Sequence, residues 1–350
     1  MTAHRVADVI GGHDVAIVLP CRNAGLAIAS VVIGFQRTLP GATIYVFDNG
    51  SDDNTAHMAR AAGARVIREP RAGTGDLALR IFSAVDADLY ILADGNGAYD
   101  PADAPALIET LIDTGADMVV GARGPAHAPA GQGLRETLMA ALVPALSESG
   151  FSDWTSGFRV FTRRFARSCA ATTGRRKIGM DLSLHAWEVG MPTAETTVAF
   201  VEAPEGAATR ASRWRGGIVA LGETMDLIVT LHPLALFAAL SALLSVPAIA
   251  LAGLAIAAAP PFGAARLAGI LVSGGFGLAA LIVGACGLVL DGLNRVRLEQ
   301  KRLAYLSCPA FPAGRAAARR PIVAHGEDDP TLQAAANPTA RYAERAANAA

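Results

Sequence analysis

Apolar and polar positions alternate in two different rhythms along the first part of the chain. Short runs rich in Val, Ile and Tyr are followed by longer segments whose apolar residues recur at helical spacing. This rhythm is typical of an α/β fold, with a mostly parallel β-sheet covered by helices on both faces. The predicted strands are 15–19, 43–47, 65–67, 89–93 and 117–121, and the predicted helices are 26–37, 53–62, 76–84 and 102–114.

The pattern changes in the C-terminal part, where two long runs carry no Asp, Glu, Lys or Arg. The first is 227–265 and the second is 267–290. Each is long enough for a helix that crosses a bilayer, which takes about 20 apolar residues. Two buried helices of a soluble protein are the alternative, but core helices seldom run so long without a polar face. The sequence therefore predicts a transmembrane hairpin over 231–290, with spans at about 234–257 and 267–290.

Positive charge differs between the two sides of this hairpin. The linker between the spans, 259–266, holds two prolines and a single basic residue, Arg266, so the spans are expected to be antiparallel neighbours. The basic residues after the second span are Arg295, Arg297, Lys301, Arg302, Arg315, Arg319 and Arg320. Cytoplasmic loops carry the excess of Lys and Arg, so both termini and the first domain are expected in the cytoplasm. Residues 1–14 lack the apolar core of a signal peptide. We expect a multi-pass protein of the bacterial inner (cytoplasmic) membrane.

Cysteine and histidine spacing gives no metal or disulfide framework. The cysteines Cys21, Cys169, Cys286 and Cys308 are far apart, and no zinc spacing is present. We interpret His185 as a packing residue. The net charge of −1 gives no reason to expect nucleic acid as a partner.

Polar residues concentrate directly after the predicted strands. They are PCRN at 20–23, DNGSDDNT at 48–55, DGNGAYD at 94–100 and ARG at 122–124. Ligands of open parallel sheets bind at the carboxyl ends of the strands, so these segments are the candidate site. DNGSDDNT is explained equally well by an Asn-Gly turn with Asp52 or Asp53 as a helix cap. The Gly73-Thr74-Gly75 turn precedes the third helix, where its amides could meet an anion.

The segments after the fifth predicted strand are more varied. A helical pattern covers 134–148, the motif FSDWTSGFRVFTRRF occupies 151–165, and 203–217 is a basic loop. A helix at 179–189 and a strand at 194–201 are also predicted. The expected divisions are an N-terminal extension 1–14, a domain 15–216, an amphipathic membrane-approach helix 217–230, the hairpin, a basic cytoplasmic helix 291–307 and a disordered tail 308–350.

In this order, PCRN, DNGSDD, the Gly-x-Gly turn, DG followed by YD, GAR, SDWTSGFRVFTRRF and PEGAATRASRWRGG resemble the family 2 inverting glycosyltransferases of the GT-A fold. Within that family the chain is similar to the polyprenyl-phosphate (dolichyl-phosphate) sugar synthases, which carry a membrane hairpin of this kind. The likeness covers roughly residues 14–300, and the D-x-x-SGFR segment is its most specific part.

The resemblance implies a role for each matching residue. Pro20, Asn23, Asp48, Ser51, Gly73, Gly75, Asp94 and Gly95 would bind the nucleotide-sugar, with Asp48 accepting hydrogen bonds from the base. Asp94 and Asn96 would hold Mg²⁺ or Mn²⁺ on the diphosphate. Arg123, Ser156, Arg159 and Arg210 would bind the acceptor phosphate, and Asp153, Arg159, Arg123 and Arg210 form the implied catalytic set. A homo-oligomer is also consistent with the resemblance.

The chain departs from the family pattern at several charged positions. Ala24, Thr74, the pair Asn96-Gly97, Ala203 and Gly216 stand where charged residues are usual, and Arg175-Arg176-Lys177 replaces a Gly-Phe-Glu segment. An amide oxygen is a neutral and weaker ligand for a hard cation than a carboxylate. The sequence therefore predicts a weakened metal site.

Two hypotheses of different classes follow for the function, and a variant of the first transfers the sugar to a protein or glycan acceptor instead of a lipid phosphate. The first is a membrane-anchored inverting glycosyltransferase that moves a hexose from a UDP- or GDP-sugar to a polyprenyl phosphate on the cytoplasmic face. The alternative is a catalytically degenerate glycosyltransferase fold that acts as a nucleotide-binding or partner subunit, as the lost charges suggest.

Overall fold

The computed structural model describes residues 12–68, 77–124, 152–169, 178–201, 222, 229, 232–257 and 264–311. Its strands are β1 (Val15–Cys21), β2 (Thr43–Asp48), β3 (Arg65–Arg68), β4 (Leu89–Leu92), β5 (Met118–Arg123), β6 (Arg159–Thr162) and β7 (Thr193–Val198). Its helices are α2 (Ile28–Thr38), α3 (Thr55–Ala61), α4 (Leu77–Ala84), the 3₁₀ turn η1 (Pro101–Asp103), α5 (Ala104–Thr114), α7 (Arg163–Ser168), α8 (Ile178–Val189), α10 (Pro233–Ala257) and α11 (Ala264–Leu306).

The strands form one sheet in the order β3-β2-β1-β4-β6-β5-β7. Pairing is parallel throughout except at β6, which runs antiparallel to both β4 and β5. The predicted mostly parallel sheet is confirmed, and the five strands predicted in the first part of the chain are present. β6 was not predicted, because its four residues lie inside a segment whose polar residues dominate its pattern.

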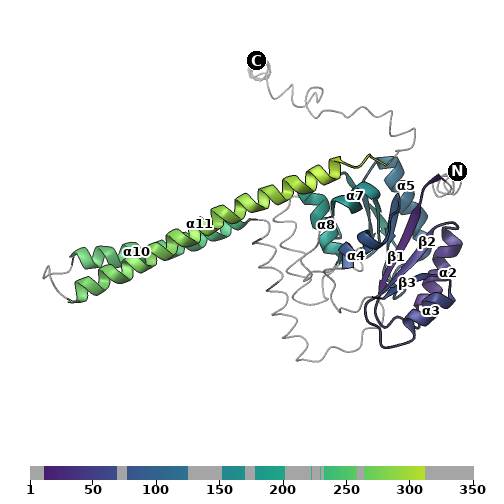
Figure 1. Ribbon diagram of the computed structural model, residues 1–350, viewed down its shortest axis with the longest axis horizontal. Helices are drawn as coiled ribbons and strands as arrows, with labels where there is room; N and C mark the ends of the chain where they lie inside the picture. Colours follow the sequence, from purple (N-terminus) through teal and green to yellow (C-terminus); the bar gives the residue numbers. More distant parts are fainter. Residues whose placement is uncertain are drawn as a thin grey trace, which may run out of the picture.

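Helices cover both faces of the sheet (Figure 1). On one face α2 and α5 bury Val32, Phe35 and Leu111 against strand residues such as Ile17. On the other face α4, α7 and α8 pack against the alternate strand residues, Val18 and Phe161 among them. The helices form because their apolar residues recur at helical spacing: α2 buries Ile28, Val31, Val32 and Phe35.

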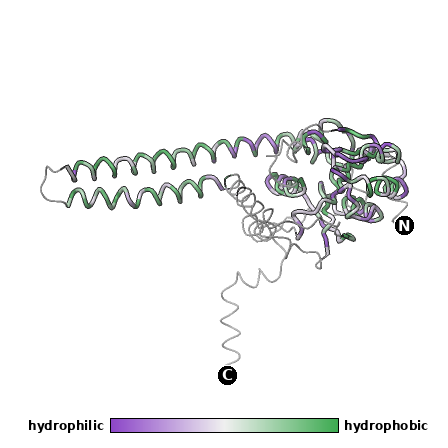
Figure 2. The backbone as a smooth tube through the Cα atoms, turned by 90° about the horizontal axis from the view of Figure 1, so that it is seen from below, coloured by the Kyte–Doolittle hydropathy of each residue, from purple (hydrophilic) through white to green (hydrophobic). Residues whose placement is uncertain are grey.

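The two C-terminal helices lie side by side as an antiparallel pair that projects from the domain (Figures 1 and 2). Small residues allow the close approach: the Ser241 hydroxyl donates to the carbonyl of Ala280 at 2.7 Å. A Cβ built on Gly287 would lie 2.5 Å from Cβ of Phe237, so only glycine fits there. The predicted spans are thus paired helices.

Apolar residues make up most of the length of both helices (Figure 2). Both helices are long and apolar enough to cross a membrane, with mean hydropathies of 2.3 and 2.1 over their most apolar windows, of which 6% and 11% is buried. Leu243, Ile249 and Leu281 are 67%, 72% and 71% exposed. Core helices of a soluble protein would be mostly buried, so that alternative does not fit the structure. The pair is a candidate membrane hairpin.

The second helix of the hairpin continues into the domain. With 43 residues, α11 is about 65 Å long, roughly twice the thickness of a bilayer core. The basic segment predicted as a separate helix at 291–307 is the continuation of α11 up to Leu306. Its end docks on the domain through Lys301, which pairs with Glu188 at 2.5 Å, and Tyr305, which donates to Asp117 at 2.5 Å.

Candidate active site

The loops that follow β1 and β2 are joined by reciprocal hydrogen bonds. The backbone N–H of Asn23 donates to the Ser51 hydroxyl, and the backbone N–H of Asp52 donates to the side-chain oxygen of Asn23, both at 2.9 Å. Asn23 has a positive φ of 53°, a conformation that asparagine tolerates better than most residues. The structure therefore brings the predicted nucleotide-binding residues Asn23 and Ser51 into contact.

Asp48 lies at the base of these loops. Its side chain is buried, with the residue 1% exposed, and its Oδ1 accepts a hydrogen bond from the backbone N–H of Ser51 at 3.0 Å. Arg68 approaches the other carboxylate oxygen, with Nε 3.7 Å from Oδ2. Burial, together with the negative charges of Asp48 and Asp53, raises the pKa of the neighbouring Cys21 thiol to about 12. The Cys21 thiol is therefore protonated at neutral pH.

Asp53 serves the local structure of the same loops. Its carboxylate accepts hydrogen bonds from the backbone N–H groups of Gly25 and Thr55, each at 3.0 Å, and from the Thr55 hydroxyl. The hydroxyl bond is the main reason why the pKa of Asp53 is lowered. Asp53 thus closes a turn, but neither Asp52 nor Asp53 is the N-cap of α3, which is Asn54 and makes no side-chain capping bond. Asn23 and Ser51 lie where the two loops meet.

The loop after β4 presses against the end of β1. The backbone N–H of Gly95 donates to the carbonyl of Pro20 at 3.2 Å, and a Cβ on Gly95 would lie 2.8 Å from Cβ of Cys21. Glycine is thus required for the close approach. As a result the predicted residues Pro20, Asp48 and Asp94 come from adjacent strand ends of one sheet edge.

Asp94 and Asn96, the predicted metal ligands, occupy different environments. Asp94 is partly buried and lies beside Gly157, on which a built Cβ would be 2.9 Å from both carboxylate oxygens. Asn96 is exposed, and its side-chain oxygen accepts a hydrogen bond from the backbone N–H of Ala98 at 3.0 Å. That oxygen closes a local turn, so it would have to share its lone pairs with a metal.

Within the described ranges, no group of three or more His, Cys, Asp or Glu residues could hold a metal ion. One carboxylate with one amide oxygen still fits a magnesium or manganese ion that arrives with its substrate, because Mg²⁺ commonly keeps waters and phosphate oxygens as ligands. The donor set at Asp94 and Asn96 therefore fits a metal carried mainly by the substrate.

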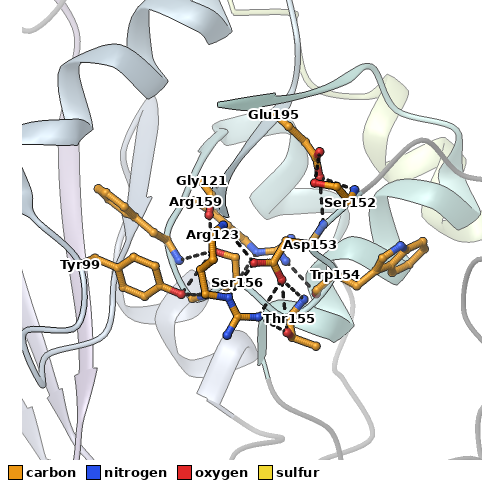
Figure 3. Close-up of polar contacts among 12 residues, drawn as sticks. Tyr99, Gly121, Arg123, Ser152, Asp153, Trp154, Thr155, Ser156, Arg159 and Glu195 are labelled. Carbon is orange, nitrogen blue, oxygen red and sulfur yellow. Dashed lines mark hydrogen bonds and ion pairs between the residues drawn. The ribbon is translucent and has the colours of Figure 1, made fainter. Parts of the chain in front are cut away.

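The segment 152–158 lies beside the Asp94 carboxylate and is called the wall of the site below. Its Asp153 makes a bidentate ion pair with Arg123 at the end of β5 (Figure 3). Arg123 donates through Nε at 2.7 Å and through Nη2 at 2.8 Å to the two oxygens of Asp153, and its Nη2 also contacts the Thr155 hydroxyl. Burial alone would raise the pKa of Asp153, but the hydrogen bonds and charge of Arg123 outweigh it and lower the pKa. Asp153 is therefore ionised at neutral pH.

Glu195 of β7 holds the start of the same segment. Its carboxylate accepts from the backbone N–H of Ser152 at 2.8 Å and from the Ser152 hydroxyl at 2.7 Å, on the far side of Asp153 from Arg123 (Figure 3). The Arg123 guanidinium also lies 5.3 Å from the ring centre of Phe200. Neither Glu195 nor Phe200 was identified from the sequence, since both lie beyond the recognised motifs.

Ser156 is fully buried and ties the wall to β5. Its hydroxyl donates to the carbonyl of Gly121 at 2.6 Å and accepts from the backbone N–H of Phe158 at 3.2 Å. Tyr99 adds a link from the β4 loop, because its hydroxyl accepts from the backbone N–H of Gly157 at 2.9 Å. Tyr99 belongs to the YD motif in the sequence, but its contact with the wall was not foreseen.

Arg159 has no exposed surface. Its guanidinium donates to the carbonyls of Ser156 and Trp154, each at 2.9 Å, and to the Ser183 hydroxyl at 2.8 Å. Burial lowers its pKa to about 10, so it stays protonated at neutral pH. The predicted contact between Arg159 and an acceptor phosphate stays a prediction, and this geometry favours a positioning role for Arg159.

Several predicted site residues lie outside the described residues. They are Gly73, Gly75 and Arg210, together with the departures at Thr74, Ala203, Gly216 and 175–177, and the predicted segments 134–148 and 203–217. Most of the membrane-approach helix at 217–230 and the tail from residue 312 also lie outside them.

Comparison with known proteins agrees with the family resemblance of the sequence motifs. The glycosyl transferase family 2 model matches residues 16–167. Protein RfbJ of Shigella flexneri is 47% identical over 110 residues, which cover 31% of this chain and 85% of RfbJ. A dolichyl-phosphate hexose transferase of Haloferax volcanii is 31% identical over 153 residues, which cover 43% of this chain and 67% of that protein.

Among solved structures, glucosyl-3-phosphoglycerate synthase of Mycobacterium tuberculosis, in complex with Mn²⁺, UDP and glucosyl-3-phosphoglycerate, has a similar fold. Its TM-score is 0.52 with 20% sequence identity, and the match covers 65% of this chain and 83% of that one. At this identity the likeness supports the fold alone.

Proposed function

Because the chain belongs to glycosyl transferase family 2 and has the GT-A fold, we propose that it moves a hexose from a nucleotide-diphospho-sugar to a polyprenyl phosphate. A lipid-phosphate oxygen forms the new bond to the anomeric carbon as the bond from that carbon to the nucleoside diphosphate breaks on the opposite face. The nucleoside diphosphate leaves, and the anomeric configuration is inverted. The dolichyl-phosphate hexose transferase among the relatives supports this acceptor class.

The observation that carries the proposal is the continuity of α11. One helix runs from the apolar hairpin to a docking site on the domain formed by Glu188 and Asp117. Such a helix ties the domain to the membrane surface, which is where a lipid phosphate lies. The excess of basic residues after the second span supports a cytoplasmic domain.

The donor would bind at the β1, β2 and β4 loops. Asp48 has one carboxylate oxygen engaged by the backbone of Ser51, and its second oxygen, which the exposed Arg68 side chain approaches at 3.7 Å, would accept hydrogen bonds from a uracil or guanine base. Asp94, with Asn96, would hold Mg²⁺ or Mn²⁺ against the diphosphate. When bound, that metal would neutralise charge that builds on the leaving diphosphate.

The acceptor phosphate would bind at the opposite wall. A lipid phosphate is already anionic at neutral pH, so it needs positioning more than a general base. Arg123 supplies this, because among the described residues its Nη1 has no hydrogen-bond partner, while Nε and Nη2 are engaged. Asp153 would hold Arg123 in place, Ser156 and Arg159 would fix the wall, and Arg210 would add a further cation.

A degenerate fold that binds a nucleotide without transfer is the second candidate. It is favoured by Asn96, whose side-chain oxygen is used in a turn, and by the absence of a three-residue carboxylate or histidine cluster in the described part of the chain. A nucleotide would then bind at Asp48 without any sugar product.

A reconstituted transfer assay tests the proposal. The full chain in nanodiscs is given radiolabelled UDP- and GDP-hexoses, either with undecaprenyl phosphate or with undecaprenol as a control that lacks the phosphate. We expect label in the organic extract with the phosphate and none with the alcohol. Label that stays in water-soluble glycan or protein would assign another acceptor, and nucleotide binding without any product would favour the degenerate fold.

A further inference from the structure

Phe200 lies two residues after β7 and is tied by its backbone to the loop after β4. It forms an isolated antiparallel bridge with Tyr99. The residues on either side of Phe200 donate their backbone N–H groups, one to the Asp103 carboxylate at 2.7 Å and the other to the carbonyl of Ala98 at 2.9 Å. Backbone contacts on three consecutive residues thus fix the place of the Phe200 side chain.

The ring of Phe200 packs against other apolar groups. Its centre lies 5.2 Å from that of Tyr99, with the planes at 57°, and the Tyr99 ring lies 5.4 Å from that of Phe158 in the wall. Tilted rings about 4.5–7 Å apart are a favourable arrangement of aromatic side chains. Phe200 is partly buried and also contacts the hydrophobic core that α2 and α5 cover. These contacts hold the ring in one orientation.

Arg123 lies over this ring. Its guanidinium carbon is 5.3 Å from the ring centre, within the distance of about 6 Å at which the negative face of an aromatic ring attracts a cation. The hydrogen bond with Asp153 raises the pKa of Arg123, so the group is charged at neutral pH. The Arg123 side chain is 10% exposed, and the attraction is stronger where water is largely excluded. Phe200 therefore stabilises the guanidinium in addition to Asp153.

Asp153 alone does not fix the orientation of the guanidinium. Its carboxylate binds one edge, through Nε and Nη2 of Arg123. A tilt about the line through these two nitrogens would change both bonds little, but it would move Nη1, the one nitrogen off that line. The Phe200 ring supports the guanidinium carbon from outside this edge and so limits the tilt. Nη1, which has no hydrogen-bond partner within the part of the chain that the structure describes, is thereby held in one place.

We propose that Phe200 is a positioning residue for the acceptor phosphate, because its ring holds the Arg123 guanidinium with Nη1 available to donate to a phosphate oxygen. The inference rests on the proposed function, in which Arg123 binds that phosphate. Phe200 acts through Arg123 and is not itself a catalytic residue. Loss of its ring is therefore expected to weaken acceptor binding and to leave donor binding unchanged.

Phe200→Leu tests this role, because leucine keeps an apolar side chain and removes the ring face. In nanodiscs, the full chain with this change should have its KM for undecaprenyl phosphate raised about two- to fivefold, the size expected for the loss of one cation–π contact. Its kcat and its KM for the nucleotide-sugar should stay at the wild-type values. Phe200→Tyr, which keeps the ring face, should have the wild-type KM for the acceptor.

Phe311→Leu is the matched control. Phe311 is also partly buried on the same hydrophobic core, but its ring lies against His13. A rise in the acceptor KM as large in Phe311→Leu as in Phe200→Leu would assign the effect to packing and overturn the inference. An unchanged acceptor KM in Phe200→Leu would overturn it as well.

Melting temperatures separate this inference from the proposed function. Phe200→Leu should lower the melting temperature more in the wild-type background than in Arg123→Met/Asp153→Asn, where the cation and its counter-charge are both removed. Equal lowering in the two backgrounds would show that the ring does not hold Arg123, even if transfer is seen. Absence of transfer by the wild-type protein would overturn the proposed function, and with it the role of Phe200 at the acceptor, even where the melting temperatures show the contact.

Discussion

The carboxylate of Asp94 lies against the α-carbon of Gly157, so closely that a Cβ at position 157 would be 2.9 Å from both of its oxygens. Real Cβ atoms essentially never come closer than 3.0 Å to a neighbour. The contact joins the loop after β4 to the wall formed by 152–158. Glycine at position 157 thus sets where the Asp94 carboxylate stands in the proposed donor site.

Gly157→Ala is expected to displace Asp94 and lower transfer at least about tenfold, because a small misplacement of a positioning group costs one to two orders of magnitude in rate. The measurement is hexose transfer at saturating and limiting donor. Gly292→Ala is the matched control, since a Cβ there meets nothing within 4 Å. Equal activities of the two variants would show that Gly157 does not position Asp94.

Asp153→Asn should destabilise the domain by about 3 kcal/mol, because it leaves the Arg123 guanidinium, whose side chain is only 10% exposed, without a counter-charge. Thermal unfolding in nanodiscs measures the effect. The control is Asp86→Asn, which removes exposed pairs with Arg167 and Arg163; the three side chains are 60%, 48% and 41% exposed. Exposed pairs contribute about 0–1 kcal/mol each. If Asp153→Asn lowers the stability of the domain no more than the control does, the Asp153–Arg123 ion pair does not stabilise the fold as proposed.

Tyr305→Phe tests the docking of α11. It removes the 2.5 Å hydrogen bond to Asp117 and keeps the ring beneath the Arg164 guanidinium, 4.3 Å away. A hydrogen bond to a charged group contributes about 1.5–3 kcal/mol, so amide exchange in 298–306 should accelerate about tenfold or more. Tyr45→Phe removes a hydrogen bond from Arg65 at the far edge of the sheet and should leave that exchange unchanged. Unchanged exchange in Tyr305→Phe would mean that Asp117 does not hold the helix.

His185 should make the domain sensitive to acid. Burial, with the charges of Lys301 and Arg297, lowers its pKa from 6.5 to about 3. Between these values the unfolded state binds a proton that the folded state does not, so stability falls as the pH falls from 6.5 toward 3, by up to about 1.4 kcal/mol per pH unit. Above pH 6.5 the group contributes no pH dependence.

The corresponding variant is His185→Gln, measured by melting temperature between pH 7 and pH 5. Gln retains a donor for the Ser168 hydroxyl, which lies 3.0 Å from Nε2 of His185, and it does not titrate. Its melting temperature should fall less than that of wild type over this range. Identical slopes would assign the acid sensitivity to other groups.

Local patterns were enough to predict much of the fold. The five strands of the first part of the chain and the two apolar helices could be predicted because each is encoded by the spacing of apolar residues within its own segment. β6 could not be found this way. Its place between β4 and β5 depends on pairing of Val160 with Ile91 and Val119, which are distant in sequence.

The site was predicted in outline and missed in detail for the same reason. The ends of strands can be predicted from the apolar pattern, so Asn23, Asp48 and Asp94 were expected at one edge of the sheet. The full burial of Arg159 was not predicted, because arginine is almost never fully buried unless it is paired. Its partners include loop carbonyls, which the sequence pattern does not reveal. Likewise, the turn that engages Asn96 depends on backbone geometry at Ala98.

The most direct measurement is transfer of labelled hexose to undecaprenyl phosphate by wild type and by Asp94→Asn, each in Mn²⁺ and in EDTA. Asn preserves the size of the side chain beside Gly157 and removes its charge. We predict an acid-labile glycolipid that disappears in EDTA and falls about 100-fold or more in Asp94→Asn, as expected when a group that stabilises transition-state charge is lost. Transfer by Asp94→Asn at the wild-type rate, or no transfer by either protein while nucleotide binding persists, would contradict the account.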